Sequence, residues 1–288
     1  MGNSSSQNSA KNIIEIAPNF WNIRGSFKVV MGMVNIGTHM SLIKLSNNKF
    51  LVIDTIPLNG KLEIAFNEMT NNGKDIEAVL ATHPFHTLAF PEFYEKYPNV
   101  DYYGTPRHLR NLQEIPWKGN VDDEAVRTRW EPDIELRIPA GAEWVNPQPE
   151  SYNHFTSCWV YCKSAKTVHV DDTLTYLKDA PFLSKLVGYS DDTLMFHPSI
   201  TGPGLKSEKC APYEFKGWVQ DILNSWPIDN ICCAHMDNKI GGGTVALQKL
   251  LDDSEGVFKK LSENAENGKK SDESADYQKY NVSKCDCG

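Results

Sequence analysis

Two histidines of chemical interest follow an apolar strand pattern in the first third of the chain. The run 78–81 ends in Thr82 and His83, Pro84 stops the strand there, and His86 stands three residues after His83. Imidazoles in such a loop can bind a metal ion or transfer a proton. Open α/β sheets hold their functional sites at the carboxyl edge of the sheet, where this loop would lie. The loop therefore predicts a functional site.

Three further candidates stand at the ends of strand patterns in the second half of the chain. His154 precedes a hairpin pattern, Asp172 follows that hairpin, and His235 ends a short apolar run of its own. A catalytic zinc ion takes three protein ligands of imidazole or carboxylate type and keeps one position for water. These residue types fit that requirement if the fold brings the strand ends together.

The elements that must position these residues alternate between strand and helix patterns. Short β-branched or aromatic runs bounded by turn residues predict strands, and longer amphipathic segments predict helices. His108 lies between two arginines and is expected on a solvated helix face. We expect strands at 27–33, 41–45, 50–53, 78–81, 101–104, 159–162 and 167–170, and helices at 58–69, 91–97 and 244–261.

The histidine loop resembles the metal-binding loop of the metallo-β-lactamase-fold superfamily, whose signature reads His-x-His-x-Asp-His. His83 matches the first histidine of that signature. Phe85, Thr87 and Leu88 stand at the positions of the second histidine, the aspartate and the last histidine. Asp54, at the end of an early strand, matches a residue that usually has a structural, supporting role in the superfamily. The resemblance therefore implies a metal site with a degenerate ligand motif.

Later motifs of the same superfamily have closer matches in this chain. His154 corresponds to the histidine before the hairpin, and His235 corresponds to the last histidine ligand. Asp172 corresponds to the aspartate after the hairpin, with Asp171 in place of the usual glycine. Over residues 13–262 the resemblance implies an α/β protein that forms a single four-layer αββα sandwich.

The two metal positions of the superfamily are unequally preserved in this sequence. The first position keeps His83, His154 and Asp172, whereas the second keeps only Asp172 and His235, which argues against a dinuclear centre. His86 can share a helical face with His83 and so replace the ligand missing from the loop. A single zinc or iron ion is the implied cofactor. The implied metal ligands are His83, His154, Asp172 and His235, and the implied catalytic residues are Asp172 and His86.

Two functions agree with this ligand set. Thr87 replaces an aspartate that acts as a ligand and a candidate proton shuttle, which favours an eroded metal site in a protein that is non-catalytic or only weakly metal-binding. The alternative is a mononuclear metal-dependent hydrolase that acts on a small ester, thioester or lactone. The non-catalytic protein would use the fold as a binding or scaffold module. The expected partner is a small-molecule ligand or substrate of unknown identity.

Composition restricts the partners and the compartment. The 288 residues are 40% hydrophobic, enough for a substantial core, and they carry a formal net charge of −8, which argues against a nucleic-acid partner. No stretch approaches the ~18 apolar residues of a transmembrane helix, and the polar N-terminus does not have the form of a secretory signal. The seven cysteines predict reduced thiols in a cytoplasmic protein, with Cys232 and Cys233 as small buried hydrophobes.

The two ends of the chain differ from the middle in composition. Residues 1–12 form a polar arm, expected to be flexible, that fits the N-myristoylation pattern at Gly2. One myristoyl chain supports only weak, reversible membrane association, with a constant of about 10⁴ M⁻¹. Residues 263–288 form a polar tail, expected to be disordered, that contains Cys285 and Cys287. The domain itself is therefore expected to span residues 13–262.

Overall fold

The seven-stranded sheet of the N-terminal half carries the first histidine loop. A computed structural model describes residues 12–29, 34–150, 153–180 and 190–266. The strands of this sheet are β1 (Ile13–Ala17), β2 (Phe20–Gly25), β5 (Thr38–Lys44), β6 (Phe50–Ile53), β7 (Ile76–Leu80), β8 (Asp101–Gly104) and β9 (Gly119–Asn120). They pair in the order β1-β2-β5-β6-β7-β8-β9, antiparallel from β1 to β6 and parallel from β6 to β9. β6 is buried along its whole length and apolar throughout, as expected for a strand covered on both faces.

A five-stranded sheet faces the first one and carries the other candidate residues at its strand ends. Its strands are β10 (Ile134–Arg137), β11 (Trp159–Cys162), β12 (Thr167–His169), β15 (Asn230–Cys232) and β16 (Asn238–Lys239). β11 and β12 form the predicted hairpin, and β12 pairs parallel with β15. Two separate hairpins flank the sheets, β3 (Lys28–Val29) with β4 (Val34–Asn35), and β13 (Leu174–Leu177) with β14 (Thr193–Phe196).

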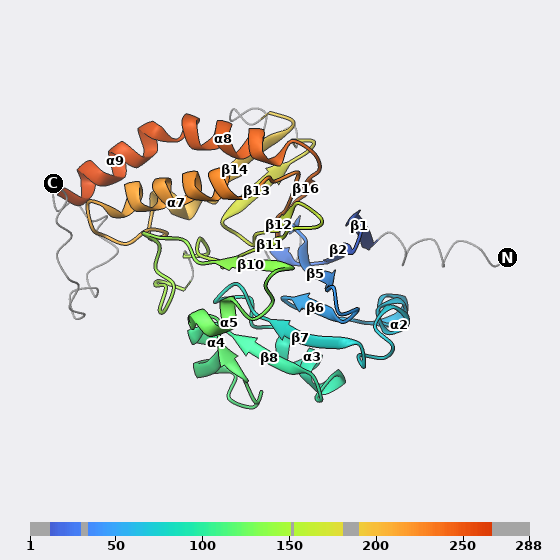
Figure 1. Cartoon of the computed structure of the whole chain (residues 1–288). Coiled ribbons are helices and arrows are strands. Elements are labelled where there is room, and N and C mark those ends of the chain that lie inside the picture. Colours follow the sequence, from blue (N-terminus) through green and yellow to red (C-terminus); the bar gives the residue numbers. More distant parts are fainter. Residues whose placement is uncertain (1–11, 30–33, 151–152, 181–189, 267–288) are drawn as a thin grey trace.

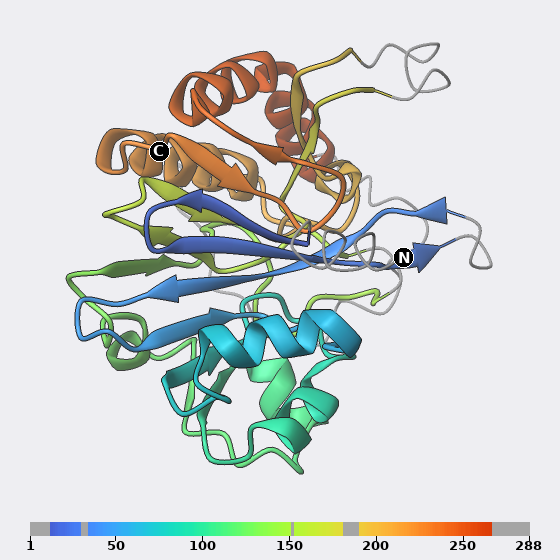
Figure 2. The ribbon, with the colours of Figure 1, turned by 90° about the vertical axis from the view of Figure 1, so that its right-hand side faces the viewer.

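Helices cover the outer face of each sheet, so that the molecule has four layers (Figure 1 and Figure 2). On the five-stranded side lie α7 (Ala211–Ser225), α8 (Gly243–Asp253) and α9 (Glu255–Glu266), together with the short 3-10 helix η1 (Pro198–Thr201). On the seven-stranded side lie α2 (Gly60–Met69), α3 (Phe90–Lys96) and α4 (Pro106–Asn111). The short helix α5 (Glu124–Arg127) packs through Val126 into the layer between the sheets. This is the predicted αββα sandwich.

Three apolar layers hold the four structural layers together. The layer between the sheets includes Ile53, Leu80 and Val160, which alternate along their strands with residues that face the helices. Val52 and Val79 pack on the helices of the seven-stranded side, and residues of α7, α8 and α9 pack on the opposite face. The histidine loops lie at one edge of the apolar layer between the sheets. Their polar side chains are therefore enclosed where that layer ends.

Some boundaries differ from those predicted. The single helix expected at 244–261 is two helices, because the chain turns at Ser254, which caps α8 through its hydroxyl bond to Leu250 O at 2.7 Å. α9 then continues to Glu266, so the first four residues of the expected disordered tail are helical. Of the strand expected at 27–33, the described part contains only the two residues of β3.

Other expectations concern residues outside the described ranges. The predicted acylation of Gly2, most of the polar arm, and the tail with Cys285 and Cys287 all lie there. Within the described ranges, none of the helices combines the length and the apolar composition needed to span a bilayer.

Candidate metal centre

The buried carboxylate of Asp172 lies among four imidazoles. Its Oδ2 is 3.7 Å from Nε2 of His83 and 3.4 Å from Nε2 of His86. The same Oδ2 is 3.5 Å from Nδ1 of His154, and Oδ1 is 3.0 Å from Nε2 of His235. The five residues predicted from strand ends and motifs therefore meet at one point of the fold.

Each of these residues lies on a loop that a sheet edge positions. His83 and His86 follow β7, while Asp172 and His235 follow β12 and β15. Because β12 and β15 run parallel, their carboxyl ends lie at the same edge of the five-stranded sheet. A backbone hydrogen bond from Cys158 N to Thr82 O, 2.8 Å long, ties the β7 loop to the opposite sheet. The site therefore spans the junction of the two sheets.

The loop that carries His235 is held from the N-terminal sheet. The guanidinium of Arg24 donates to the carbonyl oxygens of Cys233 at 2.7 Å and Met236 at 2.8 Å. Nδ1 of His235 lies 2.7 Å from the carbonyl oxygen of Gly37, an acceptor, so this nitrogen carries a proton. The other ring nitrogen, Nε2, is left to face Asp172.

The ring of His86 lies between two consecutive carboxylates. Its Nδ1 is 3.4 Å from Oδ1 of Asp171, and its Nε2 faces Asp172. The carbonyl of His86 lies 3.3 Å from Nε2 of His108. The prediction that His108 lies on a solvated helix face is wrong, because its ring is buried beneath the loop and contacts Thr105 Oγ1 at 2.9 Å.

Phe85 fills the position at which the superfamily signature has its second histidine. Its ring lies 5.1 Å from the ring of His154 and 6.0 Å from that of His83, and the guanidinium of Arg107 lies over the ring, 4.7 Å from its centre. Its backbone N–H donates to Nδ1 of His83 at 3.2 Å. The neutral ring of His83 therefore carries its proton on Nε2, the atom that faces Asp172.

The electrostatics of the site follow from burial and from the two aspartates. Burial lowers the pKa of His83 to about 3. Burial also disfavours the charged form of His86, but the carboxylates of Asp172 and Asp171 outweigh it and hold the pKa of His86 well above its usual value. Burial acts against ionisation of Asp172, yet the surrounding imidazoles, His86 first, hold its pKa well below the usual range. An ionised Asp172 is what a metal ion requires.

A metal ion fits the donor set of this site. Two atoms bound at about 2.1 Å to one tetrahedral ion lie about 3.4 Å apart, close to the 3.4–3.7 Å contacts of Asp172 Oδ2. These contacts are long for hydrogen bonds, and Oδ1 of Asp172 is buried without a well-formed hydrogen bond among the described residues. Imidazole with carboxylate suits zinc or iron. Asp172 belongs to two groups of three potential ligands. One group also contains His83 and His154, and the other also contains His86 and His235.

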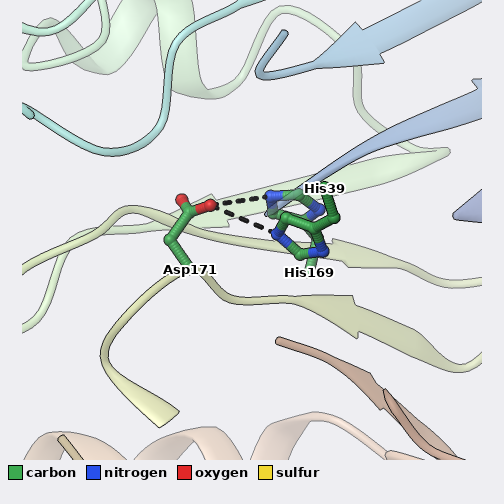
Figure 3. A group of neighbouring side chains, drawn as sticks. All are labelled: His39, His169 and Asp171. Carbon is green, nitrogen blue, oxygen red and sulfur yellow. Dashed lines mark hydrogen bonds and ion pairs between the residues drawn. The ribbon is translucent and has the colours of Figure 1, made fainter. Parts of the chain in front are cut away.

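A second group of polar residues lies directly beneath the site and was not predicted from the sequence. His39 and His169 are fully buried, and Nε2 of each lies 3.3 Å from Oδ1 of Asp171 (Figure 3). One signal was available, because His39 with Ser41 and His169 with Asp171 each have the two-residue spacing that puts both side chains on one face of a strand.

Asp54 has the supporting position that the resemblance implied. It accepts a hydrogen bond from the backbone N–H of Thr82 at 2.9 Å, and the Thr82 hydroxyl lies between Oδ2 of Asp54 and Oδ2 of Asp171, 2.7 Å from the latter. The single proton of the Thr82 hydroxyl cannot be donated to both Asp54 and Asp171. Burial, together with the charge of Asp171, raises the pKa of Asp54, so a protonated Asp54 satisfies this contact.

Solved structures of metallo-β-lactamases have the same fold as this chain. FIM-1 from Pseudomonas aeruginosa, in its mono-zinc form, matches with a TM-score of 0.53 at 11% identity, over 88% of this chain and 95% of that one. A metallo-β-lactamase from Erythrobacter litoralis gives 0.53 at 13% identity, over 84% and 96%. DIM-1 gives 0.52 at 14% identity, also over 84% and 96%. No protein-family model and no curated protein matches the sequence. The chain therefore has the metallo-β-lactamase fold, as its motifs predicted.

Proposed function

We propose that this chain is a metal-dependent hydrolase whose principal ion is held by His86, Asp172 and His235. The observation that supports this proposal is the orientation of the His86 and His235 rings and the tautomer that it favours. Nδ1 of His86 faces the carboxylate of Asp171, and Nδ1 of His235 faces the carbonyl of Gly37, so both Nε2 atoms are directed at Asp172. Metal-binding histidines use this pattern, in which an acceptor on the outer nitrogen sets the tautomer.

His83 and His154 offer a second, weaker position at Oδ2 of Asp172. An ion at either position has to displace a proton from Nε2 of a histidine. His86 can then keep its proton on Nδ1, which faces the acceptor Asp171, whereas Nδ1 of His83 faces the donor N–H of Phe85 and would lose that hydrogen bond. The proposal thus reverses the order implied by the sequence motifs, in which His83 and His154 were the primary ligands.

The chemistry would be the attack of water on a small ester, thioester or lactone. A bound zinc or iron ion lowers the pKa of its water to about 7 and polarises the carbonyl group. Of the four imidazoles, that of His154 has the largest exposed side-chain fraction, 37%, and it can take up and return a proton at the mouth of the site.

A non-catalytic protein with an eroded site is the second candidate, and Thr87 favours it. This residue stands where the superfamily has an aspartate that transfers protons, and threonine does not ionise in the neutral pH range. If His154 does not replace that function, the ion would be bound without turnover.

Metal content and hydrolysis together separate the two candidates. The full chain is purified without added metal, its zinc and iron are measured by elemental analysis, and it is assayed on nitrophenyl esters, a thioester and simple lactones. We expect bound metal and hydrolysis, both lost in His86→Gln and His235→Gln. His197→Gln is the control and should retain both, because the His197 ring hydrogen-bonds Ser199 and interacts with Asp172, His154 and His235 only electrostatically. Metal without hydrolysis supports the eroded site, and a wild-type chain that takes up no metal overturns the proposal.

A further inference from the structure

Asp171 occupies an unusual position between the candidate metal site and the buried histidine pair. Its Oδ1 faces three ring nitrogens, Nε2 of His39 and His169 at 3.3 Å and Nδ1 of His86 at 3.4 Å. Its Oδ2 accepts a hydrogen bond from Thr82 at 2.7 Å. Figure 3 shows the two buried rings side by side, both directed at this carboxylate. One carboxylate therefore links the interior to a candidate ligand.

The direction of the hydrogen bonds around His39 is set by one amide. Oδ1 of Asn22 accepts from Nδ2 of Asn238 at 2.9 Å, which leaves Nδ2 of Asn22 as the donor to Nδ1 of His39 at 3.0 Å. Since Nδ1 of His39 accepts, its Nε2 carries the proton and donates to Asp171.

His169 is oriented in the same way from a neighbouring strand. Its Nδ1 lies 2.9 Å from Oγ of Ser41, which itself accepts from Asn22 at 3.2 Å. A bare Nε2 would face the lone pairs of Asp171, so this nitrogen also carries a proton. The two rings stack with centroids 4.2 Å apart at 18°, and near-parallel rings do not converge on one ion. The group is therefore a hydrogen-bonded support and not a further metal site.

We infer that Asp171 is a positioning residue, whose carboxylate holds Nδ1–H of His86 so that Nε2 of His86 faces the ion site at Asp172. His39 and His169 hold the carboxylate of Asp171 in turn. This inference rests on the proposed function, because it assigns a role toward the ion of that site. His86 lies outside the usual signature positions, and this role of Asp171 explains how it can still act as a ligand. Asp171, which replaces the usual glycine, orients the His86 ring.

Cobalt binding tests this role without an activity assay. The full chain is freed of metal with a chelator and titrated with Co²⁺, whose visible absorption reports the ligand set. We expect Asp171→Asn to weaken the tighter cobalt site about 10–100-fold. Glu135→Gln is the control, since Glu135 in β10 is a partly buried carboxylate whose partners are Lys163, Arg137 and Trp226 instead of residues of the site. Its cobalt affinity should stay at the wild-type value.

A double-mutant cycle separates positioning from general support of the fold. His86→Gln is expected to lose the metal that survives purification, so in this background the remaining cobalt affinity is measured by titration with excess Co²⁺. There Asp171→Asn should cause no further loss of affinity, because the ring that it positions is gone. An equal loss in both backgrounds would show a merely structural role and overturn the inference.

A measurement on the wild-type chain covers the case in which Asp171→Asn does not fold. In the zinc-loaded chain with ¹⁵N-labelled histidine, Nδ1 of His86 should be protonated and Nε2 should show the shift of a metal-bound nitrogen. A protonated Nε2 and a metal-bound Nδ1 of His86 would overturn the inference. If the wild-type chain binds cobalt but Asp171→Asn binds it equally well, only this inference fails; if the wild-type chain binds none, the proposed function fails with it.

Discussion

Nε2 of His83 lies 3.7 Å from Oδ2 of Asp172, although the two residues follow strands of different sheets. His83 follows β7 of the seven-stranded sheet, and Asp172 follows β12 of the five-stranded sheet. The candidate site therefore exists only while the two sheets are packed, and its geometry depends on the apolar layer between them.

Zinc should stabilise the folded chain. A ligand that binds only the folded state at a free concentration of 100 times its Kd stabilises that state by about 2.7 kcal/mol. For a domain of this size, this corresponds to a rise in Tm of about 5–10 °C, measured by calorimetry. His235→Gln should abolish the rise, whereas His197→Gln should keep it. An equal rise in both variants would place zinc elsewhere on the protein.

Removal of the charge of Asp172 should destabilise the metal-free chain. Four imidazoles surround this buried carboxylate, and breaking a buried ion pair from one side costs about 3 kcal/mol. Urea unfolding of Asp172→Asn should show this loss. Asp229→Asn is the comparison, because the Asp229 side chain is 59% exposed and its pair with Lys166 spans 4.0 Å. That exposed pair should contribute less than about 1 kcal/mol. Similar losses in the two variants would contradict a buried anionic centre.

His108 should make stability depend on pH. Burial lowers its pKa to about 3, whereas an unfolded histidine titrates near about 6.5. The contribution of His108 to the free energy of unfolding is complete above pH ~6.5. It is lost as the pH falls toward 3, because the unfolded state then binds a proton that the folded state does not. At pH 5 the loss is about 2 kcal/mol relative to pH 7.5.

The variant His108→Gln isolates that contribution. Urea unfolding at both pH values should show a loss on acidification that is smaller in His108→Gln than in the wild type by this amount, since other groups titrate equally in both. Equal losses would mean that His108 is accessible to protons in the folded chain.

Two glycines should respond in opposite directions to the same change. Gly141 has φ +70°, and a Cβ there would lie 2.1 Å from the carbonyl oxygen of Ala211, so Gly141→Ala should destabilise by about 2–3 kcal/mol. Gly217 lies inside α7, and a Cβ added there would have open space around it among the described residues. Gly217→Ala should therefore stabilise by about 0.5–1 kcal/mol. Chemical unfolding of the two variants provides the comparison, and a destabilised Gly217→Ala would contradict the packing of this face of α7.

The fold was predictable because its signals are local. The apolar runs of β6 and β7, the hairpin of β11 and β12 and the polar residues that end them are visible as periodicity and turn chemistry. The break between α8 and α9 was not visible, because the amphipathic pattern continues across Ser254 and a serine hydroxyl bonded to the carbonyl four residues back also occurs in continuous helices.

The site was predictable as a set of residues and not as an arrangement. His83, His154, Asp172 and His235 were identified from motif positions, and all of them meet. His39 and His169 were missed, since their two-residue spacing to Ser41 and Asp171 indicates a shared strand face but not the partner on another strand.

The sequence by itself determined which side chains stand at the strand ends, because strand period and turn residues are encoded over a few neighbouring positions. Only the tertiary structure decided which imidazole nitrogen faces Asp172. Ring orientation depends on acceptors far away in the chain, such as Asp171 for His86 and Gly37 for His235. Those acceptors are brought into reach by the packing of two sheets, which no local pattern encodes.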